Sequence, residues 1–580
     1  MAKEKVKRRI SDRLLITYCV TGTVTFCILT WMLAQRFAKV SEPKSCVVQH
    51  VDNDQNEQKD TETSTSPDFE VTEEMRNRVL LLRRIKNQIT EMWRATLHGL
   101  NGLKDDEDIT DRVQETLKQL KLRHHSLMID AEDLVAFDRP WQEKVAKETE
   151  KELITKIVDL QYPKNCDEAP QFYVPLTECG YGCAFRHLAG CLEQSMVNNL
   201  TLVAGFSNSI YSTDIKEGEF PIEETSSCPP PTNLKGWTEV LCQLTQCAPR
   251  NENLSRNITE HKKVFMKIEF IPTAVGFKPP GVTDEYWSRV ASFHGNPKAW
   301  WTGQLLKYLQ MPTEGMKNEI NEALATRVDF TKPIVGVHVR RTDKIYLPGE
   351  DSEVHTLAEY MQHVADWYDK YEMRLEKENR VETVERRVFL ATDDPEVWKE
   401  TAGYPGYTFI GNRKFSETAV DLEKRETLEG LKQVIIDTAL LSKCDFIVGT
   451  LSSSVTSAAY ELRQAEHLDA SDDVASLDYS YGAVDYPNRI QVAIYPHTAN
   501  ATTHEIELKI GDIIYTDTNL WNGYFRGRTR RTGEVGMYPT YKVKDSTVYY
   551  SDIDKEIMNI YRFDEAEDDD GNRFQQILKF

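Results

Sequence analysis

The residues best suited to chemistry lie in one short segment, His338-Val339-Arg340-Arg341-Thr342-Asp343-Lys344. Two adjacent arginines carry permanent charge, and their forked donors suit the oxygens of a diphosphate better than a lysine ammonium does. The apolar run Ile334–Val339 before them predicts a buried parallel strand, and ligands of open α/β sheets bind outside the carboxyl ends of such strands. The segment therefore predicts a site for the diphosphate of a nucleotide-sugar. The alternative is a surface charge cluster with Asp343 as its own counterion.

Polar side chains also cluster where two further apolar runs end. They are Thr392-Asp393-Asp394, Thr450 with Ser452-Ser453-Ser454, and Asp437 in the helical segment between the two runs. Singly, such residues are common in turns and helix caps. Because they share one edge of the predicted sheet, together they suit ribose, the edges of guanine and phosphate.

Several motifs of other phosphate and metal sites are absent from the sequence. There is no Gly-x4-Gly-Lys-Ser/Thr loop, no Gly-x-Gly-x-x-Gly and no His-Glu-x-x-His. The pairs Asp52-Asn-Asp54 and Asp552-Ile-Asp554 lie near the two ends of the chain, far from the predicted strands. We therefore expect no cofactor and no metal, with arginine neutralising the departing diphosphate.

The elements that must position these residues begin near residue 160, where short apolar runs alternate with amphipathic stretches. The runs that predict strands are Leu200–Val203, Phe265–Phe270, Ile334–Val339, Arg387–Thr392 and Asp445–Thr450, with helices predicted near 357–377 and 428–442. This alternation is typical of an α/β, doubly wound, Rossmann-like domain. From Arg489 onward, short strands with Gly and Asn turns predict a small β-barrel.

The amino-terminal region predicts a membrane anchor. Residues 14–35 contain no charged side chain, and at about 1.5 Å per residue they would cross a hydrocarbon layer of about 30 Å. The alternative, a cleaved signal peptide, would have a shorter apolar region and a small-residue cleavage site. Basic residues outnumber acidic ones before the span, so residues 1–13 should be cytosolic and the remainder lumenal.

Sequons and cysteines agree with a lumenal compartment. Acceptor sequons begin at Asn199, Asn253, Asn257 and Asn500. Of the 11 cysteines, most outside the span crowd between Cys166 and Cys247, which indicates disulfides in an oxidising lumen. Zinc is the rival interpretation, but Cys179-x3-Cys183 lacks a matching second pair of ligands.

Residues 36–70 are polar and predict an extended stem, and a helical segment follows at 71–160. Its apolar stripe consists of Met75, Val79, Leu82, Ile89 and Trp93, and it resumes at Val113, Leu117 and Leu120. This stripe could pair with a second chain or cover the catalytic domain, and we favour a homodimer. A further helix is predicted from Pro140 to near Asp159.

The formal charge of −21 disfavours broad binding to nucleic acid, and part of that charge forms a solvated acidic end at 564–570.

One ordered set of motifs resembles a known family. The motifs are Cys179-Gly-Tyr-Gly-Cys183, His294-Gly-Asn-Pro-Lys-Ala-Trp-Trp301, Gly336-Val-His-Val-Arg-Arg-Thr-Asp-Lys344, Ala391-Thr-Asp-Asp-Pro395 and the terminal barrel. Together they are similar to the core α1,6-fucosyltransferases of N-glycan processing, from the anchor to the barrel. The resemblance implies a GT-B-like catalytic domain in the Golgi membrane, as a single-pass type II protein with a lumenal catalytic domain. It also implies inverting, metal-independent transfer of fucose from GDP-fucose to the innermost N-acetylglucosamine of N-glycoproteins.

The resemblance also assigns roles by position. Residues expected to bind the donor are His338, Arg340, Arg341, Asp343, Arg425, Asp437 and Ser453, with Tyr211 and Asp394 as further candidates. Arg340 and Lys344 are expected to be catalytic as well. The glutamate that the family places four residues after the lysine is displaced here, since Pro348 holds that position in a longer loop. Glu350 is the chosen base, with Asp351 and Glu353 as rivals.

For the cysteines, the resemblance implies the bridges Cys166–Cys228 and Cys179–Cys183. Cys191 lacks its family partner, and Cys242 or Cys247 is the expected substitute. Two further family cysteines are replaced together, by Gly449 and Thr456.

The barrel resembles a Src-homology-3 domain, with Trp521 and Pro539-Thr-Tyr541 where that family lines its peptide groove. Since His497 replaces an expected tyrosine and Asn500 is a sequon, we favour a role in acceptor recognition, dimer contacts or partner docking.

The predicted organisation is 1–13 cytosolic tail, 14–35 anchor, 36–70 stem, 71–160 helical or coiled-coil segment, 161–487 catalytic domain, 488–548 SH3-like domain and 549–580 acidic tail. Two alternatives to the leading function remain. One is a lumenal membrane-tethered adaptor or lectin without catalysis, which the displaced glutamate would allow. The other is an enzyme that transfers fucose to protein hydroxyls, which the barrel and the helical segment disfavour.

Overall fold

The structure is a computed structural model of the chain. It describes residues 72–101, 110–166, 168–175, 180–205, 241, 245, 264–265, 278–279, 281–327, 330–342, 354–478, 481, 489–545, 563–567 and 573–577, all of which belong to the unit Val71–Phe580. The predicted tail, anchor and stem lie outside these residues. Among the helices that the structure describes, none is long and apolar enough to cross a membrane.

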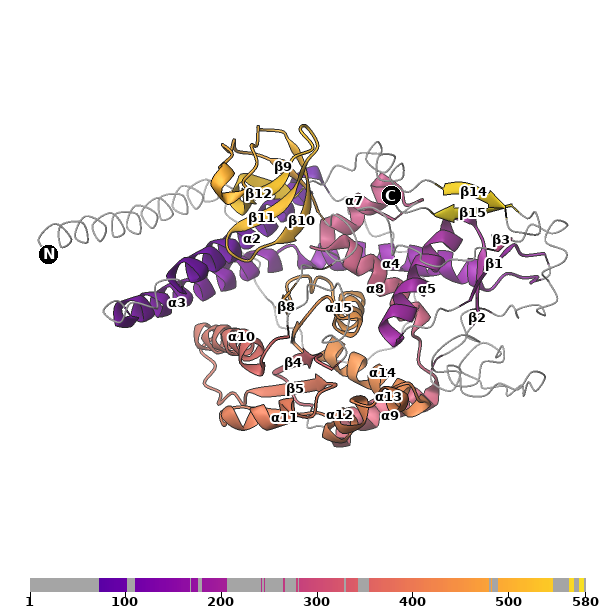
Figure 1. Cartoon of the computed structure of the whole chain (residues 1–580), viewed down its shortest axis with the longest axis horizontal. Coiled ribbons are helices and arrows are strands. Elements are labelled where there is room, and N and C mark those ends of the chain that lie inside the picture. Colours follow the sequence, from indigo (N-terminus) through magenta and orange to yellow (C-terminus); the bar gives the residue numbers. More distant parts are fainter. Residues whose placement is uncertain are drawn as a thin grey trace, which may run out of the picture. The chain divides into compact units, whose positions relative to one another are not determined.

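Five parallel strands form the central sheet in the order β6-β5-β4-β7-β8. Figure 1 labels β4, β5 and β8 of this sheet. They are β4 (Ile334–Val339), β5 (Arg387–Thr392), β6 (Thr408–Ile410), β7 (Phe446–Gly449) and β8 (Val474–Ser476). The first two match the predicted strands to the residue, and β7 is shorter than predicted. Chain order reverses between β4 and β7, so the carboxyl ends of these strands flank a topological switch point.

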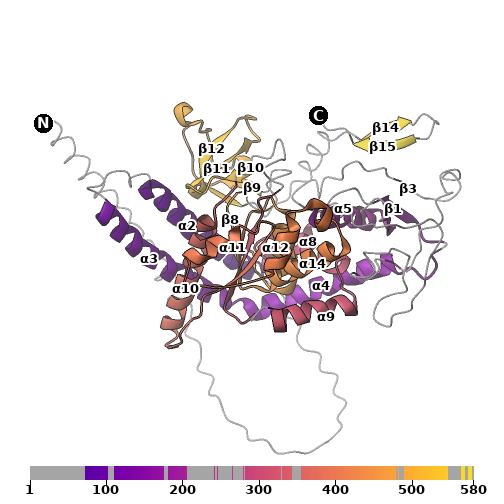
Figure 2. The same cartoon turned by 60° about the horizontal axis from the view of Figure 1, so that its bottom comes forward.

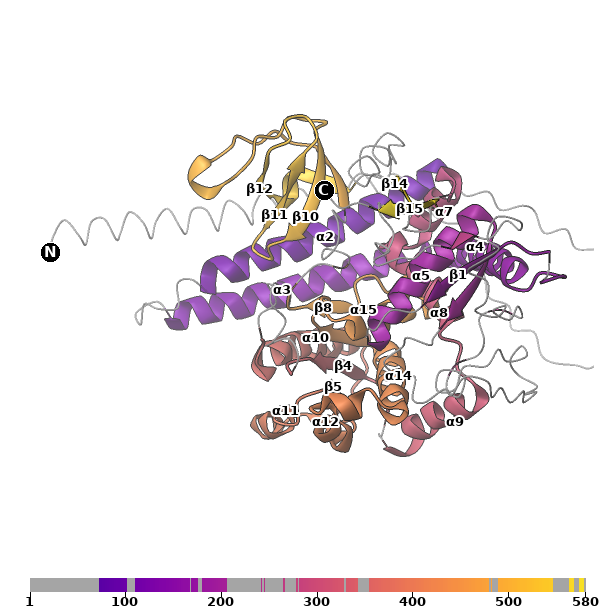
Figure 3. The ribbon, with the colours of Figure 1, turned by 45° about the vertical axis from the view of Figure 1, so that its right-hand side comes forward.

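Successive residues of the strands face different helical layers, because side chains of a strand point to opposite faces in turn. Val337 packs against α10 (Leu357–Lys377), whereas Ile334 belongs to the apolar cluster that holds α14 (Leu428–Lys443) and α15 (Ser454–Glu466). Helices therefore cover both faces (Figure 3), which explains the continuous apolar runs and confirms the doubly wound α/β prediction. Both predicted helices in this region are confirmed.

A smaller parallel sheet has the order β2-β1-β3. Its strands are β1 (Gln171–Pro175), β2 (Thr201–Gly205) and β3 (Val264–Phe265), and the helices of this part of the chain are α4 (Arg139–Gln161), α5 (Tyr181–Asn198), α7 (Asp284–Phe293) and α8 (Pro297–Leu309). The next helix, α9 (Glu314–Glu322), packs on α14. α4 confirms the predicted helix. α8 lies so close to α15 that a Cβ on Gly303 would come within 2.0 Å of the Glu461 carbonyl oxygen, so only glycine fits there. This approach joins the smaller sheet's helices to those beneath the central sheet.

The predicted helical segment forms two helices, α2 (Glu73–Asn101) and α3 (Thr110–Ala136), which lie side by side (Figures 1 and 3). Their apolar stripe is used within the chain, since Val79 and Ile89 are buried and Trp93 stacks on His124 of α3. α3 also lies along α10 (Figure 2). The stripe thus covers the chain's own helices, one of its two predicted uses, and pairing with a second chain stays a prediction.

The predicted small barrel is a five-stranded antiparallel sheet in the order β12-β11-β10-β9-β13. The strands are β9 (Arg489–Ala493), β10 (Ile513–Asn519), β11 (Tyr524–Thr529), β12 (Val535–Pro539) and β13 (Val543–Asp545). It packs on α2: a Cβ on Gly523, whose φ is +90°, would lie 2.7 Å from the Ala95 Cβ, and Arg94 stacks 4.0 Å over the Trp521 ring. One face of the Trp521 ring is therefore covered by the chain's own helix, whereas Tyr541 is exposed.

The acidic end contains one paired element that its composition does not reveal. β14 (Phe563–Glu567) and β15 (Arg573–Ile577) form an antiparallel pair within the segment predicted to be solvated.

Candidate active site

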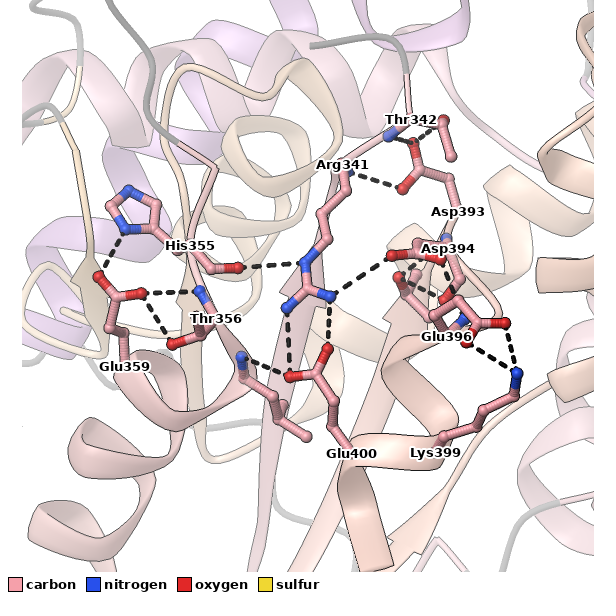
Figure 4. A network of polar contacts seen from close by, with 12 residues as sticks. Arg341, Thr342, His355, Thr356, Glu359, Asp393, Asp394, Glu396, Lys399 and Glu400 are labelled. Atoms are coloured by element: carbon pink, nitrogen blue, oxygen red, sulfur yellow. Dashed lines mark hydrogen bonds and ion pairs between the residues drawn. The ribbon is translucent and has the colours of Figure 1, made fainter. Parts of the chain in front are cut away.

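Arg341 ties together several segments at the carboxyl end of β4 (Figure 4). Its Nη1 and Nη2 donate to the two oxygens of Glu400, at 2.5 and 3.3 Å, and Nη1 also reaches Asp394 at 3.4 Å. Its Nε donates to the His355 carbonyl at 3.1 Å, and the side chain is 13% exposed. Glu400 in turn accepts from the backbone N–H of Leu357, the first residue of α10, at 3.0 Å. Arg341 therefore connects the end of β4 with the start of α10 and the end of α11 (Val397–Glu400), and it is not a member of a surface charge cluster.

Glu400 ends the short helix α11 (Val397–Glu400), and its bond with Arg341 holds the pKa of its carboxyl below the ordinary value. Burial opposes the charge of Arg341, but the bonds to Glu400 outweigh it and raise the pKa of the guanidinium. Both groups are therefore charged across the physiological range.

Asp393, at the end of β5, organises the chain after Arg341. Its carboxylate accepts from the backbone N–H of Arg341 at 2.9 Å and from the Thr342 hydroxyl at 2.6 Å (Figure 4). Arg425, which ends α13 (Leu422–Arg425), forms an ion pair with Asp393 at 3.8 Å. The Asp393 carboxylate thus contacts two predicted donor-binding arginines, Arg341 shortly after β4 and Arg425 at the end of α13. The sequence predicted Asp393 only as one of several polar residues that follow β5.

His338 of β4 and Thr456 of α15 meet across the switch point. The Nδ1 of His338 lies 2.7 Å from the Thr456 hydroxyl in the first turn of α15. His338 is 8% exposed and Thr456 is 0% exposed. His338 shares its strand face with Ile334, which explains why it points toward α15.

Asp437 is a buried carboxyl on α14. Leu441, one helical turn later, packs on Gly336 of β4, so Asp437 lies on the same face of the sheet as His338. Its carboxyl accepts from the Gln433 amide at 2.8 Å, and Gln433 accepts from Asn412 at 2.7 Å. Burial raises the pKa of Asp437 to about 7, because no cation is among its hydrogen-bond partners in the described part of the chain.

Ser453 is the residue directly before α15, in the turn that follows β7. The residue is fully buried, and within the described residues its hydroxyl has no hydrogen-bond partner. A buried, unsatisfied hydroxyl costs free energy unless a ligand satisfies it. It stands at a helix N-terminus, where backbone N–H groups favour anions, so the hydroxyl marks a place for a polar ligand group.

The remaining predicted site residues divide by where they fall. Arg340 is half-buried directly after β4. Tyr211, Asp343, Lys344 and Glu350, with the rivals Asp351 and Glu353, lie outside the described residues. The part of the chain that the structure describes holds no group of three or more His, Cys, Asp or Glu side chains that could bind a metal ion.

The cysteine predictions have mixed outcomes. Cys166 and Cys183 are both disulfide-bonded, while their predicted partners Cys228 and Cys179 lie outside the described residues, so the pairings stay predictions. Cys191 is free and buried, which corrects the expectation that it pairs with Cys242 or Cys247. Its place in the middle of α5, within the apolar core, keeps the thiol from reaching a loop cysteine.

Of the predicted sequons, Asn199 and Asn500 are exposed, as glycan attachment requires, whereas Asn253 and Asn257 lie outside the described residues.

Asp393 was predicted only as one member of the polar group after β5, and Glu400 and Thr456 carried no assigned role. Asp393 had the strongest signal, since it stands in the polar group after β5. Glu400 and Thr456 had none, because their partners lie 59 and 118 positions away in the sequence.

The chain is similar to known proteins along most of its length. Residues 28–482 match a family described as "Alpha-(1,6)-fucosyltransferase N- and catalytic domains". An alpha-(1,6)-fucosyltransferase of Drosophila melanogaster is 30% identical over 479 residues, which cover 80% of this chain and 72% of that protein. One of Caenorhabditis elegans is 30% identical over 400 residues, covering 67% and 66%. A crystal structure of NodZ alpha-1,6-fucosyltransferase soaked with GDP-fucose has 16% identity, covers 50% of this chain and 92% of that chain, and has a TM-score of 0.27, too low to support an argument.

Proposed function

Since the chain belongs to the alpha-(1,6)-fucosyltransferase family, we propose that it transfers fucose from GDP-fucose, in α1,6 linkage, to the innermost N-acetylglucosamine of N-glycans. The observation that carries this proposal is the group of buried polar side chains at the switch point. His338, Asp437 and the unsatisfied hydroxyl of Ser453 lie on one face of the sheet, next to the carboxyl ends of β4 and β7. Open α/β sheets bind nucleotides at this position.

In the proposed mechanism, different residues of the site bind different parts of GDP-fucose. The Asp437 carboxylate accepts the N–H donors of guanine, and Ser453 with the N-terminus of α15 binds phosphate. Arg340, the residue before Arg341, stabilises the charge that develops on the leaving GDP. Arg341 holds Arg340 in place through Glu400 and Asp394, and therefore acts mainly as a positioning residue.

The acceptor hydroxyl must lose its proton as an oxocarbenium-like sugar leaves the diphosphate. A carboxylate in the loop 345–354 serves as this base, with Glu350 the first choice and Asp351 and Glu353 the rivals. Lys344 assists at the same end of the site. The reaction is proposed to invert the anomeric centre and to need neither metal nor cofactor.

The cellular setting is part of the same proposal. A span at 14–35 would anchor the chain in the Golgi membrane as a single-pass type II protein, with N-glycoprotein acceptors in the lumen. The GT-B-like division of the catalytic domain is supported by two parallel sheets, β2-β1-β3 and the central one. An SH3-like role for the barrel is proposed for acceptor or partner contacts away from Trp521, because Arg94 covers that ring. A homodimer through the helical segment completes the assembly.

The decisive experiment incubates the full chain in detergent with GDP-fucose, EDTA and an N-glycopeptide that has terminal N-acetylglucosamine on its trimannosyl core. Mass spectrometry should locate one added fucose on the innermost N-acetylglucosamine. Fucose on a serine or threonine would instead identify a protein-hydroxyl transferase, and GDP binding without transfer would favour an adaptor or lectin.

Glu350→Gln tests the base. We expect this variant to bind GDP as tightly as the wild type but to lose turnover, because the amide cannot accept the acceptor's proton. Full activity in Glu350→Gln would reassign the base to Asp351 or Glu353, and the same substitution at each would then decide between them.

A further inference from the structure

His338 and Thr456 form a buried hydrogen bond that the proposed mechanism does not use. The Nδ1 of His338 and the Thr456 hydroxyl oxygen are 2.7 Å apart, and the two residues are 8% and 0% exposed. In such a poorly hydrated place a hydrogen bond is stronger than at the surface, and the loss of one partner is correspondingly costly. The bond connects the end of β4 to the first turn of α15, so it also joins the two sides of the switch point.

Gly449, the last residue of β7, leaves the room that Thr456 occupies. A Cβ at position 449 would lie 2.6 Å from the Thr456 methyl carbon and 2.9 Å from its hydroxyl oxygen. Both distances are too short for any side chain, so glycine is needed for the threonine to sit where it meets His338. The three residues therefore form one unit: Gly449 leaves the space, Thr456 fills it, and the Thr456 hydroxyl shares a hydrogen bond with His338.

The same geometry explains the change from the family pattern, in which both positions are cysteines. The Cβ built at Gly449 lies 3.4 Å from the Thr456 Cβ, close to the separation of about 3.5–4.5 Å that a disulfide requires. This chain has lost both sulfur atoms and placed a hydroxyl beside the imidazole of His338.

We propose that Thr456 is a positioning residue for donor binding, whose hydroxyl fixes the orientation of the His338 ring. The proposal rests on the proposed function, in which His338 belongs to the group of polar side chains that forms the donor site. With Nδ1 facing Thr456, a nucleotide can meet the ring only through its Nε2 edge or its face. A ring held by this bond keeps one orientation, whereas a ring without it can rotate, and only one orientation brings a given ring atom to the nucleotide.

Two substitutions separate the hydroxyl from the space that the side chain fills. Thr456→Val keeps the branched shape and removes the hydroxyl, and Thr456→Ser keeps the hydroxyl and removes the methyl group that lies against Gly449. The matched control is Thr149→Val, because Thr149 is also fully buried and its hydroxyl donates within α4, to the Val145 carbonyl, at 2.7 Å.

The measurements are the Kd of GDP by calorimetry, the KM and kcat for GDP-fucose, and the melting temperature, all on the full chain. We expect Thr456→Val to raise the Kd of GDP and the KM for GDP-fucose about five- to tenfold, the range for one lost buried hydrogen bond. Thr456→Ser should stay within about twofold of the wild type, since the hydroxyl is retained. Thr149→Val should lower the melting temperature as much as Thr456→Val without changing either binding constant.

The reverse pattern would overturn the proposal. If Thr456→Ser weakened GDP binding while Thr456→Val did not, the side chain would act by packing against Gly449. Equal effects of Thr456→Val and Thr149→Val on the Kd would show a general loss of stability. If the wild type bound GDP but transferred no fucose, the proposed function would fail while the Kd values still decided the role of Thr456; a wild type that bound no GDP would overturn both.

Discussion

The Arg341 network and the ion pairs between α3 and α10 use the same residue types but arrange them differently. In the Arg341 network, one side chain that is 13% exposed holds the end of β4, the start of α10 and the end of α11. Between α3 and α10, the charge is spread over several pairs, and their side chains, except that of His125, are more exposed. These are Lys121 with Asp366 and Asp369, His125 with Asp366, Lys370 with Glu132, Arg374 with Glu132 and Asp133, and Lys377 with Asp130 and Asp133.

The difference is one of redundancy. Most charged groups in the α3–α10 ladder have neighbours that can take a new partner, and water competes for each of them, so a single loss should be tolerated. In the Arg341 network, both Glu400 and the carbonyl of His355 depend on the one guanidinium. Concentrated, partly buried charge favours a fixed geometry, which a transition state needs, while distributed charge favours robust docking of a supporting helix.

The largest expected effect comes from Arg341→Met. Methionine keeps the unbranched stem of the side chain, but Glu400 and Asp394 lose their cation, so we expect a loss of about 3 kcal/mol in the free energy of unfolding. Because the ends of β4 and α10 are then no longer joined, fucose transfer should fall at least about 100-fold. Denaturant unfolding and the transfer assay measure the two quantities.

Arg387→Met is the matched control, since Arg387 is also 13% exposed and ion-paired, with Glu385, but at the amino end of β5. It should lower stability with little change in the Kd of GDP or in transfer per folded molecule. Equal losses of transfer in both variants would mean that Arg341 has no special relation to the site.

Asp437 differs from the carboxylates of both charge networks, because its buried carboxyl accepts a hydrogen bond from the Gln433 amide and not from a cation. Burial raises its pKa to about 7, so the free protein binds a proton there below that pH. Guanine N–H donors prefer the ionised form, and each pH unit below 7 should therefore cost about tenfold in GDP affinity. Calorimetry should show a Kd about 20-fold higher at pH 5.5 than at pH 7.5, with proton release on binding at the lower pH.

Asp437→Asn controls for the ionisation of GDP itself, because the amide does not titrate. Its Kd should be high at both pH values and should lack the protein's part of the pH dependence. A wild-type dependence no steeper than that of Asp437→Asn would separate Asp437 from donor binding.

The sequence predicts the parts of this comparison that depend on local pattern. Nearly continuous apolar runs predicted β4 and β5 to the residue, because a strand buried on both faces has few polar positions that could obscure its limits. The placing of His338 at a strand end follows directly. Glu400 could not be predicted as the partner of Arg341, since a short amphipathic helix gives no sign of which strand its last side chain reaches.

The helical segment shows a second limit of sequence reasoning. An apolar stripe at helical spacing is equally suited to a second chain and to the chain's own helices, and only tertiary contacts place Trp93 against His124. The ion pairs with α10 were not foreseen either, because opposite charges on two helices more than 200 positions apart carry no mark of their pairing.

The smallest expected effect is that of Arg374→Gln in the α3–α10 ladder. Its side chain is 28% exposed, and its partners Glu132 and Asp133 keep Lys370 and Lys377, so the free energy of unfolding should fall by about 1 kcal/mol or less. The effect should shrink further in 1 M salt, where the Debye length is only about 3 Å, whereas that of Arg341→Met should persist. Arg380→Gln, whose pairs stay local to the end of α10, is the control and should change nothing measurable. A loss from Arg374→Gln as large and as salt-resistant as that from Arg341→Met would show that α3 is held by one critical pair, and the contrast between the two networks would fail.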